Sequence, residues 1–230
     1  MASANQSATI AADQLSQGSV WRRWDLHIHS PLSVLNNQFP QLPAGQGPDW
    51  EPYIKALEGL SNVAVVGITD YFSIVGYRAV AEFRRAGRLA NIQCILPNVE
   101  LRLGTFVVHQ KSRDINLHVI FSGDLPPDEI EEEFIKALPI QVSGGGGHPG
   151  GVRQLTERTL IQVGQEIRAH HEAFRNDGDV EAAVKNITVA LDDVQRLLQK
   201  NCFKNRHLLV LSGSEWGGRR STSIRTTTPS

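Results

Sequence analysis

Short apolar runs with strand character alternate with amphipathic helical segments along the chain, and this alternation constrains its fold more than any other feature. The expected strands are 24–29, 63–70, 92–103, 115–122 and 207–216, and the expected helices are 50–60, 77–87, 126–138, 152–176 and 180–200. Several of the runs are too apolar to face water, which favours buried, parallel strands joined by right-handed crossovers. We therefore expect an α/β fold, with an open sheet or part of a barrel.

The length of 230 residues is that of one ordinary domain. Residues 1–20 are polar and have no apolar periodicity, which predicts a flexible leader. The expected domain covers 21–218. Residues 219–230, "RRSTSIRTTTPS", predict an irregular tail and suggest that the chain is truncated.

The bulk composition excludes some classes of protein. A formal net charge of −1 provides no global basic field to attract nucleic acid. No run of about 18 apolar residues predicts a membrane span, and the N-terminus lacks a signal-peptide pattern. We therefore expect a cytoplasmic protein that has no membrane partner. The glycine-rich segment 142–151 lacks the Lys-Ser/Thr ending of a phosphate-binding loop and predicts a lid or linker.

The segment "WDLHIHS" contains three potential metal ligands on alternate residues, Asp25, His27 and His29. Alternate residues of a strand point to the same face, so we expect these three side chains to project together. Imidazole nitrogens suit Zn, Mn or Fe, and carboxylates can bridge two such ions. The pattern predicts His27 and His29 as ligands and Asp25 as a supporting residue.

Other strand ends have potential ligands in similar places, namely Asp70, Glu100 and His118. Each has an ordinary alternative: Asp70 can cap a helix, Glu100 can be a solvated charge, and His118 can be a core histidine. Polar groups at the carboxyl ends of neighbouring parallel strands meet in one crevice. Taken together, these residues therefore predict a metal centre.

The motifs "DLHIHS", "GITDYFSIVGY", "ILPNVELRL" and "NLHVIF", in this order, resemble the polymerase and histidinol phosphatase (PHP) family. The resemblance covers 21–123 well and 205–218 loosely. It implies a distorted (β/α)7-type barrel of mainly parallel strands, here incomplete, which holds up to three metal ions and cleaves phosphoesters. The variants "TDYF" and "NVELRL" look most like PHP domains that precede SMC-like ATPases. The resemblance therefore implies an ATPase module as a partner in the full-length protein.

The resemblance assigns roles residue by residue. It implies that His27 and His29 bind one metal, that Glu100 bridges two metals, and that His118 binds the second. Asp70 matches an aspartate that would orient a ligand or a metal-bound water.

Two features depart from the family pattern. Tyr71 replaces a family histidine and would donate a hydrogen bond to phosphate. The late Asp-x-His motif is absent, so fewer than three ions, of Mn, Zn or Fe, are expected. Arg102 lies nearby and is a candidate to bind a substrate phosphate.

These residues predict a metal-dependent phosphoesterase that acts on a phosphodiester or phosphomonoester, with nucleic acid among the candidate substrates. The alternative from another class is a catalytically inactive PHP-like scaffold or nucleic-acid sensing module, which the replacement by Tyr71 favours. A metal-dependent amidohydrolase also uses His-x-His on a first barrel strand. No lysine lies at a strand end that matches the carbamylated bridge of that class, and Glu100 fits the PHP pattern better.

Overall fold

The computed structural model describes residues 22–35, 38–39, 41–43, 46–108, 111–142, 152–213 and 223–224. The expected leader, residues 1–20, lies outside the described residues, as do 143–151 of the glycine-rich segment and most of the expected tail. The described part has the expected α/β composition.

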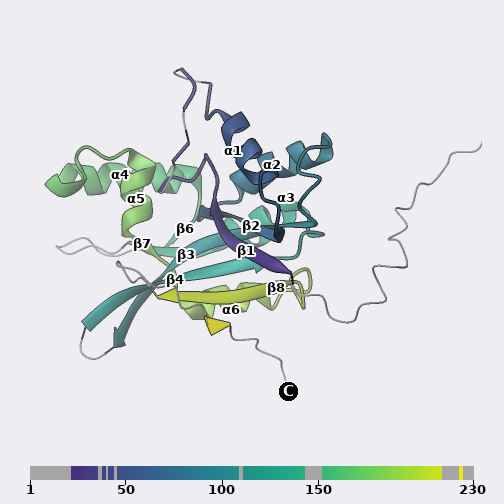
Figure 1. Ribbon diagram of the computed structural model, residues 1–230. Helices are drawn as coiled ribbons and strands as arrows, with labels where there is room; N and C mark the ends of the chain where they lie inside the picture. Colours follow the sequence, from purple (N-terminus) through teal and green to yellow (C-terminus); the bar gives the residue numbers. More distant parts are fainter. Residues whose placement is uncertain are drawn as a thin grey trace, which may run out of the picture.

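The main sheet has six strands in the order β1-β2-β3-β4-β8-β9 (Figure 1). β1, β2 and β3 run parallel, whereas β4 is antiparallel to both β3 and β8. The strands are β1 (Arg23–His29), β2 (Val63–Tyr71), β3 (Cys94–Val108), β4 (Lys111–Phe121), β8 (His207–Gly213) and β9 (Ser223–Ile224). β9 lies within the tail that was expected to be irregular, and it pairs with β8.

This sheet corrects the expectation of mainly parallel strands. Only two residues separate β3 from β4, and so short a connection can join only antiparallel strands. The described strands form an open, mixed sheet that does not close into a barrel, so the (β/α)7 arrangement is not confirmed.

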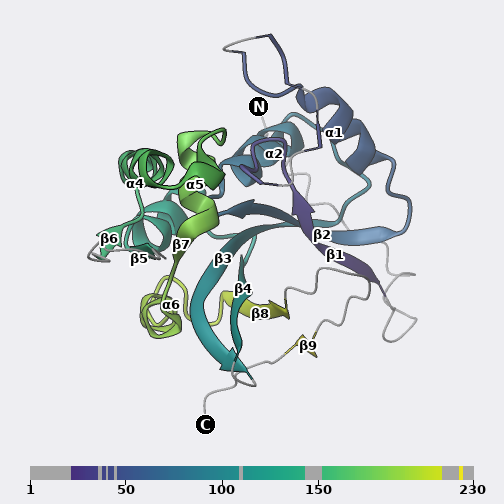
Figure 2. The ribbon, with the colours of Figure 1, turned by 90° about the vertical axis from the view of Figure 1, so that its left-hand side faces the viewer.

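Helices cover one face of the sheet (Figure 2). α1 (Trp50–Glu58) buries Tyr53, Ile54 and Leu57, and α2 (Val75–Arg85) buries Tyr77 and Val80. Beneath these helices, alternate side chains of the strands are almost fully buried, among them Val66 and Ile68 of β2 and Val99 and Leu101 of β3. The opposite face of β2 and β3 is therefore the face that can present polar groups.

The helical layer continues over β4. Phe121 of β4 packs against Phe134 and Phe203, with ring centroids 5.1 and 5.4 Å away. Phe134 belongs to a π-helical turn, η2 (Glu131–Ile135), which follows α3 (Pro127–Ile130). This aromatic cluster fixes the helical segments after β4 on the same side as α1 and α2.

A second, antiparallel sheet has the order β6-β5-β7. Its strands are β5 (Pro139–Val142), β6 (Arg153–Gln154) and β7 (Ile187–Thr188). Within the range where one helix was expected, 152–176, the structure has β6, α4 (Glu157–His170) and the 3-10 turn η3 (Glu172–Phe174).

The expectation of a single helix over 180–200 is wrong. α5 (Asp179–Asn186) and α6 (Leu191–Leu198) are separate helices, and β7 lies between them. The break coincides with the β-branched run Ile187, Thr188 and Val189, which favours extended backbone. Val189 also exchanges backbone hydrogen bonds with β3: its N–H donates to Arg102 O and its carbonyl accepts from Gly104 N.

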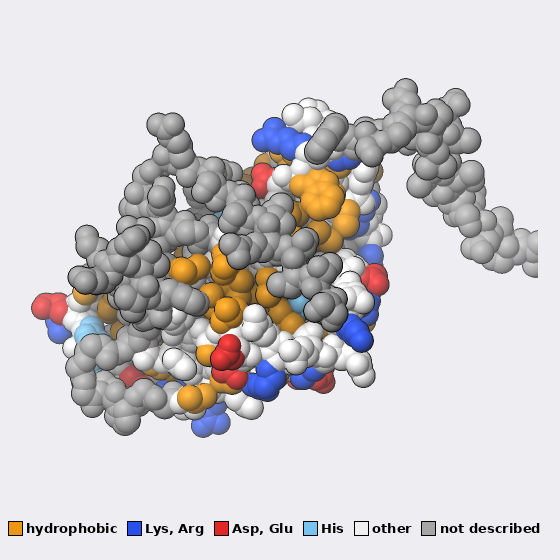
Figure 3. Space-filling view, turned by 90° about the horizontal axis from the view of Figure 1, so that it is seen from below, with side chains coloured by type: hydrophobic (Ala, Val, Ile, Leu, Met, Phe, Trp, Pro, Cys, Tyr) orange, Lys and Arg blue, Asp and Glu red, His pale blue; other side chains and the backbone are white. Residues whose placement is uncertain are grey.

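Exposed large apolar side chains within the described residues are scattered over several elements. They are Trp24, Leu32, Val34, Leu42, Val75, Val152 and Leu211. Seen from below, apolar side chains gather near the middle of one face (Figure 3). Single exposed apolar residues are normal, and we assign no partner to this face. Every helix in the described ranges is too short or too polar to cross a bilayer.

Candidate metal centre

A bulge in β1 shapes the candidate site. Asp25 pairs with Val66 and Ile28 pairs with Ile68, so three steps along β1 match only two along β2. One extra residue is therefore accommodated between Asp25 and Ile28, which is a β-bulge.

Gly67 lets the bulged backbone approach β2 closely. A Cβ atom at this position would lie 2.3 Å from the carbonyl oxygen of Leu26, a distance at which no side chain is tolerated. Asn98 of β3 fixes the same carbonyl, because its Nδ2 donates to Leu26 O at 2.7 Å. A glycine in β2 and an amide in β3 together hold β1 in its bulged form.

The bulge changes the position of Asp25, which was expected to share a face with both histidines. The register instead places Asp25 level with Val66, a residue of the helix-covered face. Its Oδ1 accepts a long hydrogen bond, 3.4 Å, from the backbone N–H of His27. Asp25 thus contacts the backbone of the bulge, and its role as a supporting residue of the metal site stays a prediction.

His27, His29 and Glu100 converge on one point. The Nε2 atoms of His27 and His29 are 3.1 Å apart, and they lie 3.3 and 3.5 Å from Oε2 of Glu100. Each of the three residues offers a donor atom within 4.8 Å of the others, so the group could hold a metal ion. Glu100 is almost fully buried, whereas the side chain of His27 is 46% exposed. The cluster is therefore anchored in the protein and open on the His27 side.

His118 lies beside this group. Its ring centroid is 4.5 Å from that of His27, and its Nε2 is 4.0 Å from Oε1 of Glu100. His118 pairs directly with Glu100 across the antiparallel β3–β4 ladder, which places the two side chains on the same face. The structure thus brings together all four residues that the sequence suggested as metal ligands.

Hydrogen bonding fixes the tautomer of His29. The Ser33 hydroxyl donates to Leu35 O at 2.7 Å, so its oxygen remains to accept from His29 Nδ1, 3.1 Å away. We therefore assign the ring proton to Nδ1, which leaves a lone pair on Nε2 facing the cluster. Metal-binding histidines are commonly oriented by such a bond at their other nitrogen.

Asn98 orients His118 in the same way. Both amide hydrogens of Asn98 have closer acceptors, Leu26 O at 2.7 Å and Thr69 Oγ1 at 2.9 Å. The contact of 3.3 Å between His118 Nδ1 and Asn98 Oδ1 is then a hydrogen bond donated by the histidine. We assign the proton of His118 to Nδ1, so that its buried Nε2 is an acceptor.

Glu100 is held by Asn116, whose Nδ2 donates to Oε1 at 2.7 Å. Burial alone would raise the pKa of Glu100, but contact with His27 and the nearby His118 and His29 hold this pKa below its ordinary value. Glu100 Oε2 and His118 Nε2 are buried, and neither has a hydrogen bond of normal geometry to any described residue. Buried polar atoms without such bonds are rare, and a water or an ion bound at this point would satisfy both.

Asp70 is not brought into this cluster. Its Oδ1 accepts from the Ser30 hydroxyl at 2.6 Å, and its Oδ2 accepts from the N–H of Gly76, in the first turn of α2, at 2.8 Å. Burial raises the pKa of this carboxyl to about 6, although both hydrogen bonds act to lower it. Asp70 therefore ties β2 to the loop after β1 and to the first turn of α2, although the N-cap residue of that helix is Ile74.

Tyr71 lies over the cluster, whereas Arg102 is engaged elsewhere. The ring of Tyr71 stacks on His29, with centroids 5.2 Å apart and an interplanar angle of 19°. The guanidinium of Arg102 donates to the carbonyls of Val184 and Lys185, near the C-terminal end of α5. Positive groups stabilise helix C-termini, so Arg102 has a structural role where phosphate binding was expected.

A pH effect on stability follows from His118. Burial lowers the pKa of His118 to about 4, against 6.5 for an unperturbed histidine, although the charge of Glu100 opposes this shift. Between pH 6.5 and 4 the unfolded chain binds a proton at His118 that the folded chain does not. The metal-free protein should lose free energy of unfolding as the pH falls through this range, by up to about 1.4 kcal/mol per pH unit.

Urea unfolding in a chelator at pH 7, 5.5 and 4.5 measures this loss, and a His118→Gln variant should show less of it. An exposed histidine at the end of α4 provides the control, His170→Gln, which should keep the wild-type pH dependence. Equal pH dependence in the wild type and His118→Gln would contradict the assignment of His118 as a buried, neutral side chain.

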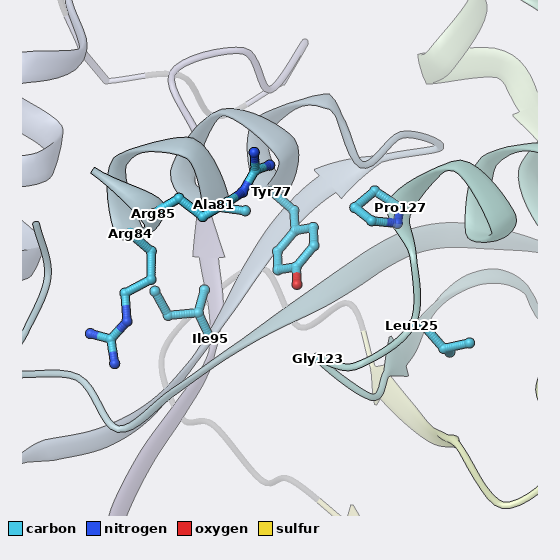
Figure 4. Close-up of a pocket in the computed structure, with 8 residues that line it drawn as sticks. All are labelled: Tyr77, Ala81, Arg84, Arg85, Ile95, Gly123, Leu125 and Pro127. Atoms are coloured by element: carbon cyan, nitrogen blue, oxygen red, sulfur yellow. The ribbon is translucent and has the colours of Figure 1, made fainter. Parts of the chain in front are cut away.

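A hollow of about 310 Å³ lies between α2, the start of β3 and the loop after β4 (Figure 4). Its lining residues are Tyr77, Ala81, Arg84, Arg85, Ile95, Gly123, Leu125 and Pro127. Both arginines already have partners, because Arg84 donates to Leu89 O and Arg85 pairs with Glu82. None of the cluster residues lines this hollow, so we do not include it in the candidate site.

No protein-family model, curated protein or solved structure matches the chain. Function must therefore be argued from the cluster itself.

Proposed function

We propose that this protein is a metal-dependent hydrolase of phosphate esters, with its metal held by His27, His29 and Glu100 and with His118 as an adjacent fourth donor. The observation that carries the proposal is a pair of buried atoms, Glu100 Oε2 and His118 Nε2, that have no hydrogen bond of normal geometry among the described residues. Glu100 Oε2 lies 3.3 and 3.5 Å from the Nε2 atoms of His27 and His29. A divalent cation would satisfy these lone pairs, which have no protein donor of normal geometry among the described residues.

The spacing of the donor atoms suits an ion. Ligand atoms bound about 2.1 Å from a metal at tetrahedral angles lie about 3.4 Å from one another. The three separations between His27 Nε2, His29 Nε2 and Glu100 Oε2 are 3.1, 3.3 and 3.5 Å. A donor set of imidazoles with one carboxylate suits Zn, Mn or Fe rather than Mg or Ca, which prefer oxygen.

The residues of the chain prepare the site for an anionic ester. A bound divalent ion would supply positive charge to the phosphate oxygens and would lower the pKa of water toward about 7. Ser33 and Asn98 keep the lone pairs of His29 and His118 directed into the cluster. The exposed side of His27 is the open approach for an ester, and Tyr71 covers His29 next to it.

Membership of the PHP family, a complete barrel and a linked ATPase module remain predictions from the resemblance.

Asp70 and Tyr71 favour a second candidate, the inactive scaffold or nucleic-acid sensing module. Both oxygens of Asp70 are engaged away from the cluster, and a phenol stands where the family has an imidazole. The site thus offers fewer ionisable groups than the resemblance implies.

Hydrolysis assays separate the two candidates. The protein should retain Zn, Mn or Fe after extensive dialysis and should hydrolyse bis(p-nitrophenyl) phosphate or p-nitrophenyl phosphate. A strong chelator should abolish the activity, and adding back one of these metals should restore it. Retained metal without turnover of either ester would reject the hydrolase and leave the scaffold.

A further inference from the structure

Asn116 controls which oxygen of Glu100 faces the metal cluster. Asn116 and His118 are alternate residues of β4, and Glu100 of β3 lies beside both. The amide Nδ2 of Asn116 donates to Oε1 at 2.7 Å, while Oε2 faces the Nε2 atoms of His27 and His29. The carboxylate therefore presents a single oxygen to the two histidines, and its other oxygen is engaged by a neutral donor.

The cluster contains little negative charge. Glu100 is the one carboxylate in the group of potential ligands found within the described residues. Apart from Asp25, whose carboxylate accepts from the backbone N–H of His27, the side chains that hydrogen-bond to the ligands are uncharged, namely Ser33, Asn98 and Asn116. Asp25 lies level with Val66 of the helix-covered face, and Asp70 is bonded to Ser30 and Gly76.

This charge balance favours one divalent ion over two. A single divalent cation (+2) beside one carboxylate (−1) leaves a local charge of +1, whereas two cations would leave +3. Glu100 is almost fully buried, and repulsion between ions a few ångströms apart is strong where water is excluded. Many carboxylates that bridge two metals offer one oxygen to each, and here Asn116 fills one of the lone-pair sites of Oε1.

We infer that the cluster binds one divalent ion per chain, and that Asn116 is the positioning residue that keeps it mononuclear. The inference rests on the proposed metal site, and it departs from the bridging of two metals by Glu100 that the family resemblance implies. Asn116 acts by holding Oε1 of Glu100 and by adding no charge. A carboxylate at the same position would complete a second metal site.

Two measurements on the wild-type chain test the number of ions directly. The protein is saturated with Mn²⁺, freed of excess ion by gel filtration, and its Mn content is compared with its concentration. One ion per chain is expected, together with the electron paramagnetic resonance spectrum of an isolated Mn²⁺. Two ions per chain, or the multiline spectrum of an exchange-coupled pair, would overturn the inference.

The role of Asn116 is tested by Asn116→Asp, which has nearly the same shape and adds one negative charge beside Oε1. This variant should bind two Mn²⁺ ions per chain and show the coupled spectrum. The control is Asn201→Asp, which adds the same charge at an exposed position after α6 and should bind one ion. A folded Asn116→Asp that still binds one ion would show that Asn116 does not set the number.

The wild-type measurements stand even if Asn116→Asp fails to fold. They also separate this inference from the proposed function, because neither readout involves turnover. One bound ion without ester hydrolysis would reject the hydrolase and keep the mononuclear site. Two bound ions with ester hydrolysis would reject the mononuclear site and keep the hydrolase. A chain that binds no ion overturns the inference outright.

Discussion

Substituting His27 and His29 together by alanine is expected to remove the bound metal and to lower ester hydrolysis by more than about 100-fold. The change deletes two of the three donor atoms that lie 3.1–3.5 Å apart and leaves Glu100, with His118 beside it. Loss of a single residue outside the ligand shell typically costs about 10–100-fold in metal affinity, and two ligands should cost more. Metal content after dialysis and the rate of bis(p-nitrophenyl) phosphate hydrolysis measure both effects.

The matched control for this pair is His170→Ala, an exposed histidine at the end of α4 whose ring bonds to the carbonyl of Glu166. It should keep the metal content and activity of the wild type. Circular dichroism should check that the double variant is folded, because His27 is 46% exposed but His29 is only 15% exposed and stacks on Tyr71. Unchanged metal content in the folded double variant would place the metal elsewhere.

Side chains along a strand point to the same face at every second residue, and this alternation is the reason that the ligands could be predicted. His27 and His29 were expected to lie close together, and Glu100 and His118 were expected at neighbouring strand ends. The structure brings all four together because β3 and β4 are adjacent and pair Glu100 with His118. The same alternation points to the supporting amides, since Asn98 is two residues before Glu100 and Asn116 is two residues before His118. Their role was missed because the predicted ligands of the site were imidazoles and carboxylates, not amides.

The parts that sequence could not predict depend on contacts between strands. A bulge shifts register by one residue, so Asp25 left the series of alternate residues that contains His27 and His29. Similarly, Asp70 follows an apolar strand as expected, but its hydrogen bonds to Ser30 and Gly76 draw it toward α2. Position at a strand end shows where a side chain is along the sheet, whereas the face it occupies depends on pairing.

Longer-range contacts account for the remaining differences. The residues of 180–200 have a continuous helical pattern, yet Val189 pairs with the backbone of β3 and interrupts it. Arg102 was predicted to bind phosphate because it follows Glu100 by two residues, but the carbonyls at the end of α5 bind its guanidinium first. Neither contact leaves a signal in the local sequence, because the partners are more than 80 residues apart.

Gly67→Ala should both destabilise the protein and weaken metal binding. The new Cβ would lie 2.3 Å from Leu26 O and 2.8 Å from Leu26 C, and backbone atoms cannot move aside as a flexible side chain could. Overpacking in a tightly packed site typically costs about 1–3 kcal/mol, and we expect a loss of about 3 kcal/mol here. Because β1 must shift away from β2, His27 and His29 should lose their alignment with Glu100, and metal affinity should fall at least about tenfold.

Urea unfolding in a chelator measures the stability term without the contribution of bound metal. Isothermal titration with Zn²⁺ measures the affinity. Gly104→Ala in β3 is the matched control, because its Cβ would lie 3.6 Å from the nearest atom, Thr188 Oγ1, which is an ordinary contact. This control should change the free energy of unfolding by less than about 1 kcal/mol and leave metal affinity unchanged. If Gly67→Ala behaves like Gly104→Ala, the close contact between β1 and β2 does not position the histidines, and the bulge cannot be what assembles the site.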